Sequence, residues 1–370
     1  MATISGGITT NAGSNDASGV ASALTTTINS QLIGGTLTVT SPTINPSTGG
    51  GLAVVSTVGG QTTLAAAVTT VVVTASTGTS TLVGGGGQGQ QVLIGSSNVT
   101  YFSGGGSGTI VTGDGNDLIG VPAVGGGNFS ISLGSGQDTV TAFSGVNTIS
   151  AGAGRDLIGT GGVGTLSSNL IFLSPGSVTV TGGSGQGNDT IIGGSGTATI
   201  IEGSKNYTFN GNGSTGSVSA FGGTGSATVF AGAGSAFAQG GSNGNNVLFG
   251  SQSGANVTLI AGGNGDLLVA RGTGSTTLAA ATGNETLQGG GGADIFQVTA
   301  GKVANLTIQG FRPDQGDRVQ LIGFASSVAG GAVSAATGNN ATTNNASIVL
   351  TDGTRITFSG VGNLSASNFI

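Results

Sequence analysis

The chain has 370 residues, of which 79 are glycine and 5% are charged, and its mean hydropathy of +0.29 is too apolar for a disordered chain. It contains no cysteine and no histidine, which excludes disulfides, thiolate metal sites, the Ser-His-Asp triad and the usual zinc centres. The net charge of −6, without any cluster of Lys or Arg, argues against nucleic acid as a partner. Abundant Val, Ile, Leu, Ala and Thr, with few helix formers, predict an all-β fold.

Residues 1–83 are predicted to form an N-terminal β segment rich in Thr and Val. Three runs within it have strand character, at 36–40, 52–56 and 68–74. Asp16 is the only acidic residue, so calcium sites are not expected here. The segment is interpreted as a cap of the fold or as an assembly region whose strands pair with a neighbouring chain. No run of 18 apolar residues occurs in the chain, so a transmembrane helix is not expected.

Residues 84–300 contain a degenerate glycine-rich repeat, G-x-G-x-D-x-U, in which U is a large apolar residue. Asp138 and Asp156 occupy the acidic position of the two clearest copies and lie two nonapeptides apart, and Asp117 precedes Asp138 by a slightly longer interval. A loose period of about 19 residues predicts one coil of a β-solenoid, so these carboxylates should lie in stacked turns. Glycine permits the tight turns, and carboxylate and carbonyl oxygens are the ligands that Ca²⁺ prefers.

The repeat therefore predicts a set of calcium ligands at the turns. The candidate metal residues are Asp114, Gly115, Asp117, Gly136, Asp138, Gly154, Asp156, Asp189 and Asp294. Asp189 and Asp294 match the motif but have no intact partner one coil away, so a structural turn is an equal alternative for them. Asp266 is interpreted as structural, and Asn or Gln in the units without an acid is expected to hydrogen-bond along the stack.

This repeat resembles that of the RTX (repeat-in-toxin) family, which comprises calcium-binding bacterial proteins exported by type I secretion. Residues 301–370 support the same resemblance, because 311–321 is similar to the segment that follows RTX repeats and 364–370 to an uncleaved secretion signal. Within that segment, Asp314 and Asp317 are assigned to a turn with salt bridges to the nearby Arg residues. The resemblance implies a parallel β-roll or β-helix with a C-terminal β cap, a few bound Ca²⁺ ions, and a secreted, extracellular or cell-surface location.

The function expected from these features is structural. Calcium outside the cell would stabilise the folded chain, which would then self-assemble into a surface layer (S-layer) or an extracellular matrix (biofilm) fibre, since few surface charges oppose packing. The partners expected are further copies of the chain and a cell-surface polysaccharide. The alternative is an RTX-type adhesin or a module that binds polysaccharide or ice. A polysaccharide-active β-helix enzyme is not favoured, because Glu202 and Glu285 lie far apart and Arg155 beside Asp156 is the one candidate pair.

Overall fold

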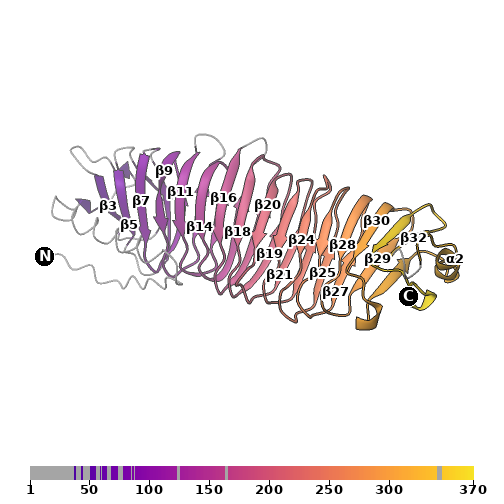
Figure 1. The fold of residues 1–370 in the computed structure, drawn as a ribbon. Helices are drawn as coiled ribbons and strands as arrows, with labels where there is room; N and C mark the ends of the chain where they lie inside the picture. Colours follow the sequence, from indigo (N-terminus) through magenta and orange to yellow (C-terminus); the bar gives the residue numbers. More distant parts are fainter. Residues whose placement is uncertain are drawn as a thin grey trace. The chain divides into compact units, whose positions relative to one another are not determined.

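The computed structural model describes residues 37–38, 43–44, 51–55, 59, 61–64, 68–73, 78–84, 86, 88–122, 126–162, 166–339 and 344–370. The chain forms two compact units, residues 1–197 and 198–370. Each unit is a parallel β-solenoid, in which successive coils add one strand to each of two sheets (Figure 1). The predicted fold class, an all-β parallel solenoid, is therefore confirmed.

Unit 1 is built from two parallel sheets, here called sheet 1 and sheet 2. Sheet 1 contains, in spatial order, β1 (Leu37–Thr38), β3 (Gly51–Val55), β5 (Val68–Val73), β7 (Gln88–Ile94), β9 (Gly106–Val111), β11 (Gly126–Ser132), β14 (Gly145–Ser150), β16 (Ser167–Phe172) and β18 (Asn188–Ile192). Sheet 2 contains β2 (Thr43–Ile44), β4 (Gln61–Leu64), β6 (Thr79–Val83), β8 (Asn98–Phe102), β10 (Leu118–Val121), β13 (Thr139–Ala142), β15 (Ala153–Thr160) and β17 (Ser177–Gly182), with β12 (Ser135–Gly136) paired to β15.

Unit 2 also has two sheets, here called sheet 3 and sheet 4. Sheet 3 contains β20 (Asn206–Asn210), β22 (Ala227–Phe230), β24 (Val247–Phe249), β26 (Leu267–Val269), β28 (Gly283–Gln288), β30 (Val303–Gln309), β33 (Arg355–Ser359) and the antiparallel β32 (Asn345–Val349). Sheet 4 contains β19 (Thr197–Ile201), β21 (Val218–Phe221), β23 (Ala236–Gln239), β25 (Val257–Ile260), β27 (Thr276–Ala279), β29 (Ile295–Thr299) and β31 (Arg318–Ile322).

The core of each unit follows the two-residue alternation of the strands. In sheet 2, Val140 and Ile158 point inward and are fully buried, whereas Thr139 and Leu157 lie on the outer face. Thr139 pairs with Leu157, so the predicted return of the chain after two nonapeptides is confirmed. Each coil thus places one or two apolar side chains from each sheet into a continuous stack, which is the main source of stability in a solenoid.

The stacking of coils continues across residue 83, where the sequence suggests a boundary. β5 pairs with β7 in sheet 1, and β6 pairs with β8 in sheet 2. The predicted strands at 36–40, 52–56 and 68–74 correspond to β1, β3 and β5. The N-terminal β segment therefore contributes strands of the same two sheets as the repeat that follows it.

The last coils of unit 2 end in a β cap, as expected from the sequence. β32 turns back against β33, and the last two residues pair with β31, where the Leu321 N–H donates to the Ile370 carbonyl and the Ile370 N–H to the Val319 carbonyl. The Phe369 ring packs edge-on against Phe358, with centroids 6.2 Å apart. Short helical segments, η2 (Pro313–Gln315), α2 (Val328–Ser334) and η3 (Ala366–Asn368), complete this end. Within the described residues, no helix is long and apolar enough to cross a membrane.

Candidate metal centre

The predicted ligands Asp117, Asp138 and Asp156 lie one above another at a corner of unit 1, where the turn enters sheet 2. All three side chains are buried, with 1–3% of their surface exposed. The repeat itself explains this orientation. The acid stands two residues before the apolar residue U, and residues two apart on a strand face the same side, so an inward U brings an inward Asp.

Hydrogen bonds connect Asp117, Asp138 and Asp156, here called the Asp column, along the axis of the stack. In each case one carboxylate oxygen accepts the backbone N–H of the equivalent residue in the preceding coil. The Val99 N–H donates to Asp117 Oδ1 at 2.7 Å, the Asp117 N–H to Asp138 Oδ1 at 2.8 Å, and the Asp138 N–H to Asp156 Oδ1 at 3.4 Å. These N–H groups lie where the strand ladder begins, so the carboxylates satisfy backbone donors that would otherwise be buried without a partner.

The second oxygens of the Asp column differ between coils. Asp156 Oδ2 accepts the Gly152 N–H at 3.0 Å. Asp117 Oδ2 and Asp138 Oδ2 are buried and have no partner of normal hydrogen-bond geometry, although the Thr112 hydroxyl is close enough to lower the pKa of Asp117. The column therefore contains two adjacent carboxylates, each with one oxygen buried and unpartnered, which is a costly arrangement for two negative charges.

Burial has a large effect on the acidity of these groups. The pKa values of Asp117 and Asp138 are raised from 3.8 to about 7, mainly by desolvation, and at Asp138 the neighbouring carboxylates Asp117 and Asp156 contribute to the rise. Desolvation also raises the pKa of Asp156, against the lowering effect of its two backbone donors. Around neutral pH, the Asp column therefore needs either protons or a cation.

A second ladder runs along the outer edge of the same corner, in the opposite direction. Here Asn98 and Asn116, each one residue before the inward-facing position of its turn, accept an N–H from the following coil. The Asn116 N–H donates to Asn98 Oδ1 at 2.8 Å, and the Gln137 N–H donates to Asn116 Oδ1 at 2.8 Å. Each corner is thus held to the coil before it and to the coil after it, by an outer amide and an inner carboxylate.

The predicted glycines Gly115, Gly136 and Gly154 form a column in the same turns. Gly115 and Gly136 have φ of +144° and +138°, in the region that only glycine adopts readily. A Cβ on Gly136 would lie 1.7 Å from the Gly115 carbonyl oxygen, and one on Gly154 would lie 1.8 Å from the Gly136 oxygen. Close stacking of the turns is therefore sufficient to require glycine here, whatever the turn binds.

The other predicted ligands lie apart from the Asp column. Asp114 is exposed, and its Oδ1 accepts the Ser135 hydroxyl. Asp189 belongs to sheet 1, where its Oδ1 accepts both the backbone and side-chain N–H of Asn169 at 2.9 Å and its Oδ2 accepts the Thr160 hydroxyl at 2.6 Å. Both oxygens of Asp189 thus have protein partners.

Asp294 begins the same kind of ladder in unit 2. Its oxygens accept the Thr276 N–H at 2.9 Å and the Gly290 N–H at 2.7 Å. No intact copy of the repeat lies one coil after Asp294, but an acidic residue does: the Asp294 N–H donates to Asp317 Oδ1, 23 residues later, at 2.8 Å. Asp317, assigned from the sequence to a turn with salt bridges, is a buried member of this ladder, and the Arg312 N–H donates to its Oδ2.

Sheet 3 contains a further ladder that includes residues not predicted as a site. Asn246 Oδ1 accepts the Ala227 N–H at 2.7 Å, and Asp266 Oδ1 accepts the Asn246 N–H at 2.8 Å, which confirms the structural role of Asp266 and the expected pairing of Asn along the stack. Glu285 is buried one coil after Asp266, and desolvation, with the Asp266 charge, raises its pKa to about 8. The two-residue spacing from the buried Leu287 was the sequence signal for this position.

Comparison with protein-family models, with curated proteins and with solved structures finds no match. Among the candidate ligands, the two unpartnered oxygens of Asp117 and Asp138 fit a cation best, because those of Asp189 and Asp294 already accept hydrogen bonds.

Replacing Asn246 by Ala is expected to destabilise unit 2 by about 3 kcal/mol. The Asn246 side chain accepts N–H groups from Ala227 and Gly241 and donates to the Gly241 carbonyl and to Asp266, so its removal leaves several buried polar groups without partners. Urea unfolding would measure the change. Asn243→Ala, at an exposed position of the same turn, is the control and should change stability little; equal losses in both variants would contradict the ladder's importance.

Proposed function

We propose that this chain is an RTX-type structural protein that is exported, folds with calcium and associates laterally with copies of itself in a surface layer or matrix. The observation that carries the self-assembly is the distribution of charge. Among the described residues from 88 to 301, the only charged residues that are not buried are Asp114, Arg155 and Arg271. Surfaces with so few charges have little electrostatic repulsion to oppose association.

The outer faces of the sheets support packing against another flat surface. In sheet 2, one outward column reads Thr100, Leu118, Thr139, Leu157 and Thr179 along the stack, without a charge. Alternating hydroxyl and apolar side chains on a regular sheet can interlock with a like face. No Lys lies on these strands, and Arg155 of β15 is their one exposed charge. The β cap closes one end of unit 2, which favours lateral over end-to-end contacts at that end.

The Asp column is the proposed calcium site. A divalent cation held by Asp117 Oδ2 and Asp138 Oδ2 would neutralise two buried carboxylates whose pKa burial raises to about 7. Binding to the folded chain alone stabilises it by mass action, and extracellular calcium modules work at roughly 10⁻⁴–10⁻³ M. Export before folding, followed by folding where calcium is abundant, agrees with this linkage.

Adding a positive charge to the outer column should prevent assembly without unfolding the chain. The double variant Thr139→Lys/Thr179→Lys places two ammonium groups on the outer face of sheet 2, where both side chains are partly exposed. Electron microscopy of the wild-type protein is expected to show ordered sheets or fibres, and of the variant dispersed particles with unchanged thermal unfolding. Thr139→Ser/Thr179→Ser is the control and should assemble.

Repeating the wild-type experiment with a chelator separates the two parts of the proposal. Assemblies that form only with calcium support both parts. Assemblies that form in both conditions would support the structural role and show that assembly does not require calcium. Dispersed wild-type particles in both conditions would refute self-assembly and favour the alternative of an adhesin or ligand-binding module.

A further inference from the structure

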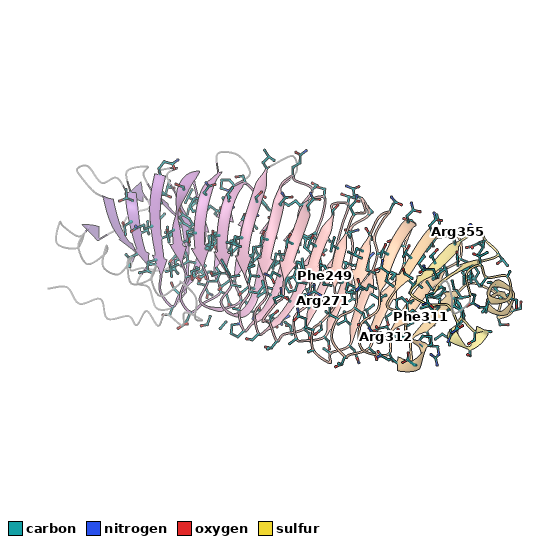
Figure 2. The ribbon with its side chains drawn as sticks, in the orientation of Figure 1. Phe249, Arg271, Phe311, Arg312 and Arg355 are labelled. Atoms are coloured by element: carbon teal, nitrogen blue, oxygen red, sulfur yellow. The ribbon has the colours of Figure 1, made fainter. Side chains whose placement is uncertain are left out.

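The guanidinium of Arg271 lies over the ring of Phe249, which is stacked on that of Phe230, on the outer face of sheet 3 (Figure 2 labels Arg271 and Phe249). Its guanidinium carbon is 4.0 Å from the Phe249 centroid and 5.6 Å from that of Phe230. The two rings are themselves stacked, with centroids 4.8 Å apart and planes at 13°. Stacking on the face of a ring fixes the plane of the guanidinium and leaves its N–H edge free to bind.

No anion of the described chain neutralises this cation. The structure gives Arg271 neither an ion pair nor a side-chain hydrogen bond within the described residues, and no carboxylate contributes to its pKa, which desolvation alone lowers. Arg312 and Arg318, by contrast, donate to backbone carbonyls of their own turn or of the adjacent coil. Arg271 therefore has unused donors, held over an aromatic ring and already partly removed from water.

The surroundings of Arg271 are uncharged and mixed in polarity. One column of paired residues on neighbouring strands contains Phe230, Phe249, Val269 and Gln288. The column beside it contains Thr228, Val247, Leu267 and Thr286. Gln288 is exposed, and Thr228 and Thr286 are partly so. Such a face offers both apolar area and hydrogen-bonding groups, which matches the apolar C–H faces and the hydroxyls of a sugar chain.

We infer that the Arg271, Phe249 and Phe230 cluster is a binding site for a carboxylate-bearing (acidic) polysaccharide. The guanidinium would donate two parallel hydrogen bonds to a sugar carboxylate, in the bidentate geometry that Arg favours. The chain would lie over the outer face of sheet 3, with its hydroxyls against Thr228, Thr286 and Gln288. The inference does not depend on self-assembly or on calcium.

A carboxylate from a second copy is the competing occupant, and the surface disfavours it. Of the 13 acidic residues, nine are buried, and the unburied ones in the described chain are Asp114, Asp314 and Asp352. Asp352 already accepts the Gly301 and Thr354 N–H groups, and Asp114 accepts the Ser135 hydroxyl. Six of the seven basic residues, in contrast, are unburied, so the surface of the described residues suits an anionic partner.

The test is calorimetric titration of the full chain with short polygalacturonate and with uncharged dextran of the same length. The wild type is expected to bind polygalacturonate more weakly as salt increases and not to bind dextran. Arg271→Gln should weaken binding by roughly tenfold or more, because it removes a charged, bidentate donor. Arg271→Lys should lose most of the affinity too, since an ammonium group cannot form the planar fork. Arg155→Gln, an exposed Arg in unit 1, is the matched control and should bind as the wild type does.

Two results would overturn the inference. Equal affinity of wild type and Arg271→Gln for polygalacturonate would show that Arg271 does not bind acidic sugars. Dissociation of a wild-type oligomer by Arg271→Gln, measured by sedimentation without any glycan effect, would assign the guanidinium to a carboxylate of another copy. Unchanged circular dichroism and thermal unfolding are expected for all the variants, since Arg271 and Arg155 are outside the core.

Discussion

Gly136→Ala is expected to destabilise unit 1 by about 4 kcal/mol or more. The new Cβ would lie 1.7 Å from the Gly115 carbonyl oxygen, so the turns could not stack at their present separation. The same residue has φ of +138°, which a side chain strongly disfavours. Because the turn also positions Asp138, its displacement would weaken the hydrogen bond from the Asp117 N–H.

Urea unfolding, followed by circular dichroism, would measure this loss. Gly331→Ala is the matched control: it lies in α2, has an ordinary φ, and a Cβ there would meet nothing within 4 Å. That variant should change stability by less than about 1 kcal/mol, in the stabilising direction. Gly213→Ala separates the two causes, because Gly213 has φ of +83° but open space around it. Equal effects at Gly136 and Gly213 would show that backbone strain, not stacking, limits the turn.

Without calcium, the folded chain is expected to lose stability as the pH rises from about 4 to 7. Asp117 and Asp138 have a folded-state pKa of about 7 against 3.8 unfolded, so in this window the folded chain holds protons that the unfolded chain has released. The free energy of unfolding therefore falls with increasing pH, by at most roughly 4 kcal/mol for each carboxyl. Glu285, with a pKa of about 8, extends the decline to slightly alkaline pH in unit 2.

Asp138→Asn is the variant that identifies the responsible group. An amide keeps an oxygen to accept the Asp117 N–H and cannot ionise, and Asn246 already has this role in the ladder of sheet 3. The variant should have a flatter pH profile and greater stability than the wild type at pH 8 without calcium. If the proposed cation binds there, calcium should raise the wild-type melting temperature at pH 8 and leave that of Asp138→Asn unchanged. The exposed Asp314→Asn is the control, and a wild-type profile that rises with pH would contradict the burial argument.

The sequence predicted the fold because the repeat encodes it locally. Glycine turns, apolar residues two positions after the acid and a return of the chain at a nearly constant interval together specify stacked coils, and Asp117, Asp138 and Asp156 do form one column. The inward direction of these carboxylates was also implicit in their spacing from U. The sequence does not show, however, whether an inward Asp binds a cation or accepts a hydrogen bond from a backbone N–H, because both roles use the same carboxylate. The role of each Asp depends on which groups its two carboxylate oxygens face in the folded chain.

Other features of the corners could not be derived from the sequence. The 23-residue separation of Asp294 and Asp317 differs from the usual coil, so their pairing depends on the length of the intervening turn. Asp189 matches the same motif as Asp156 but enters the opposite sheet, because the motif does not state which of the two corners of a coil it occupies. The two rings under Arg271 come from the neighbouring strands β22 and β24, and Arg271 follows β26; only the folded chain fixes the register of these strands.

The inner carboxylate ladder and the outer amide ladder at the corner of unit 1 also restrict where residues can be inserted into or removed from the chain. Each of these corners depends on an acceptor from the coil before and on another from the coil after, so an insertion within the corner breaks the alignment on both sides. Extra residues elsewhere in a coil do not, because steps of 21 and of 18 residues both preserve the inner ladder. A whole coil can be added without this loss, and residues 139–156 are a natural module because they start and end at the same point of the ladder. Lengthening or shortening of such a chain, by a protein engineer or by gene duplication, is thereby restricted to entire coils or to the turns away from the corners.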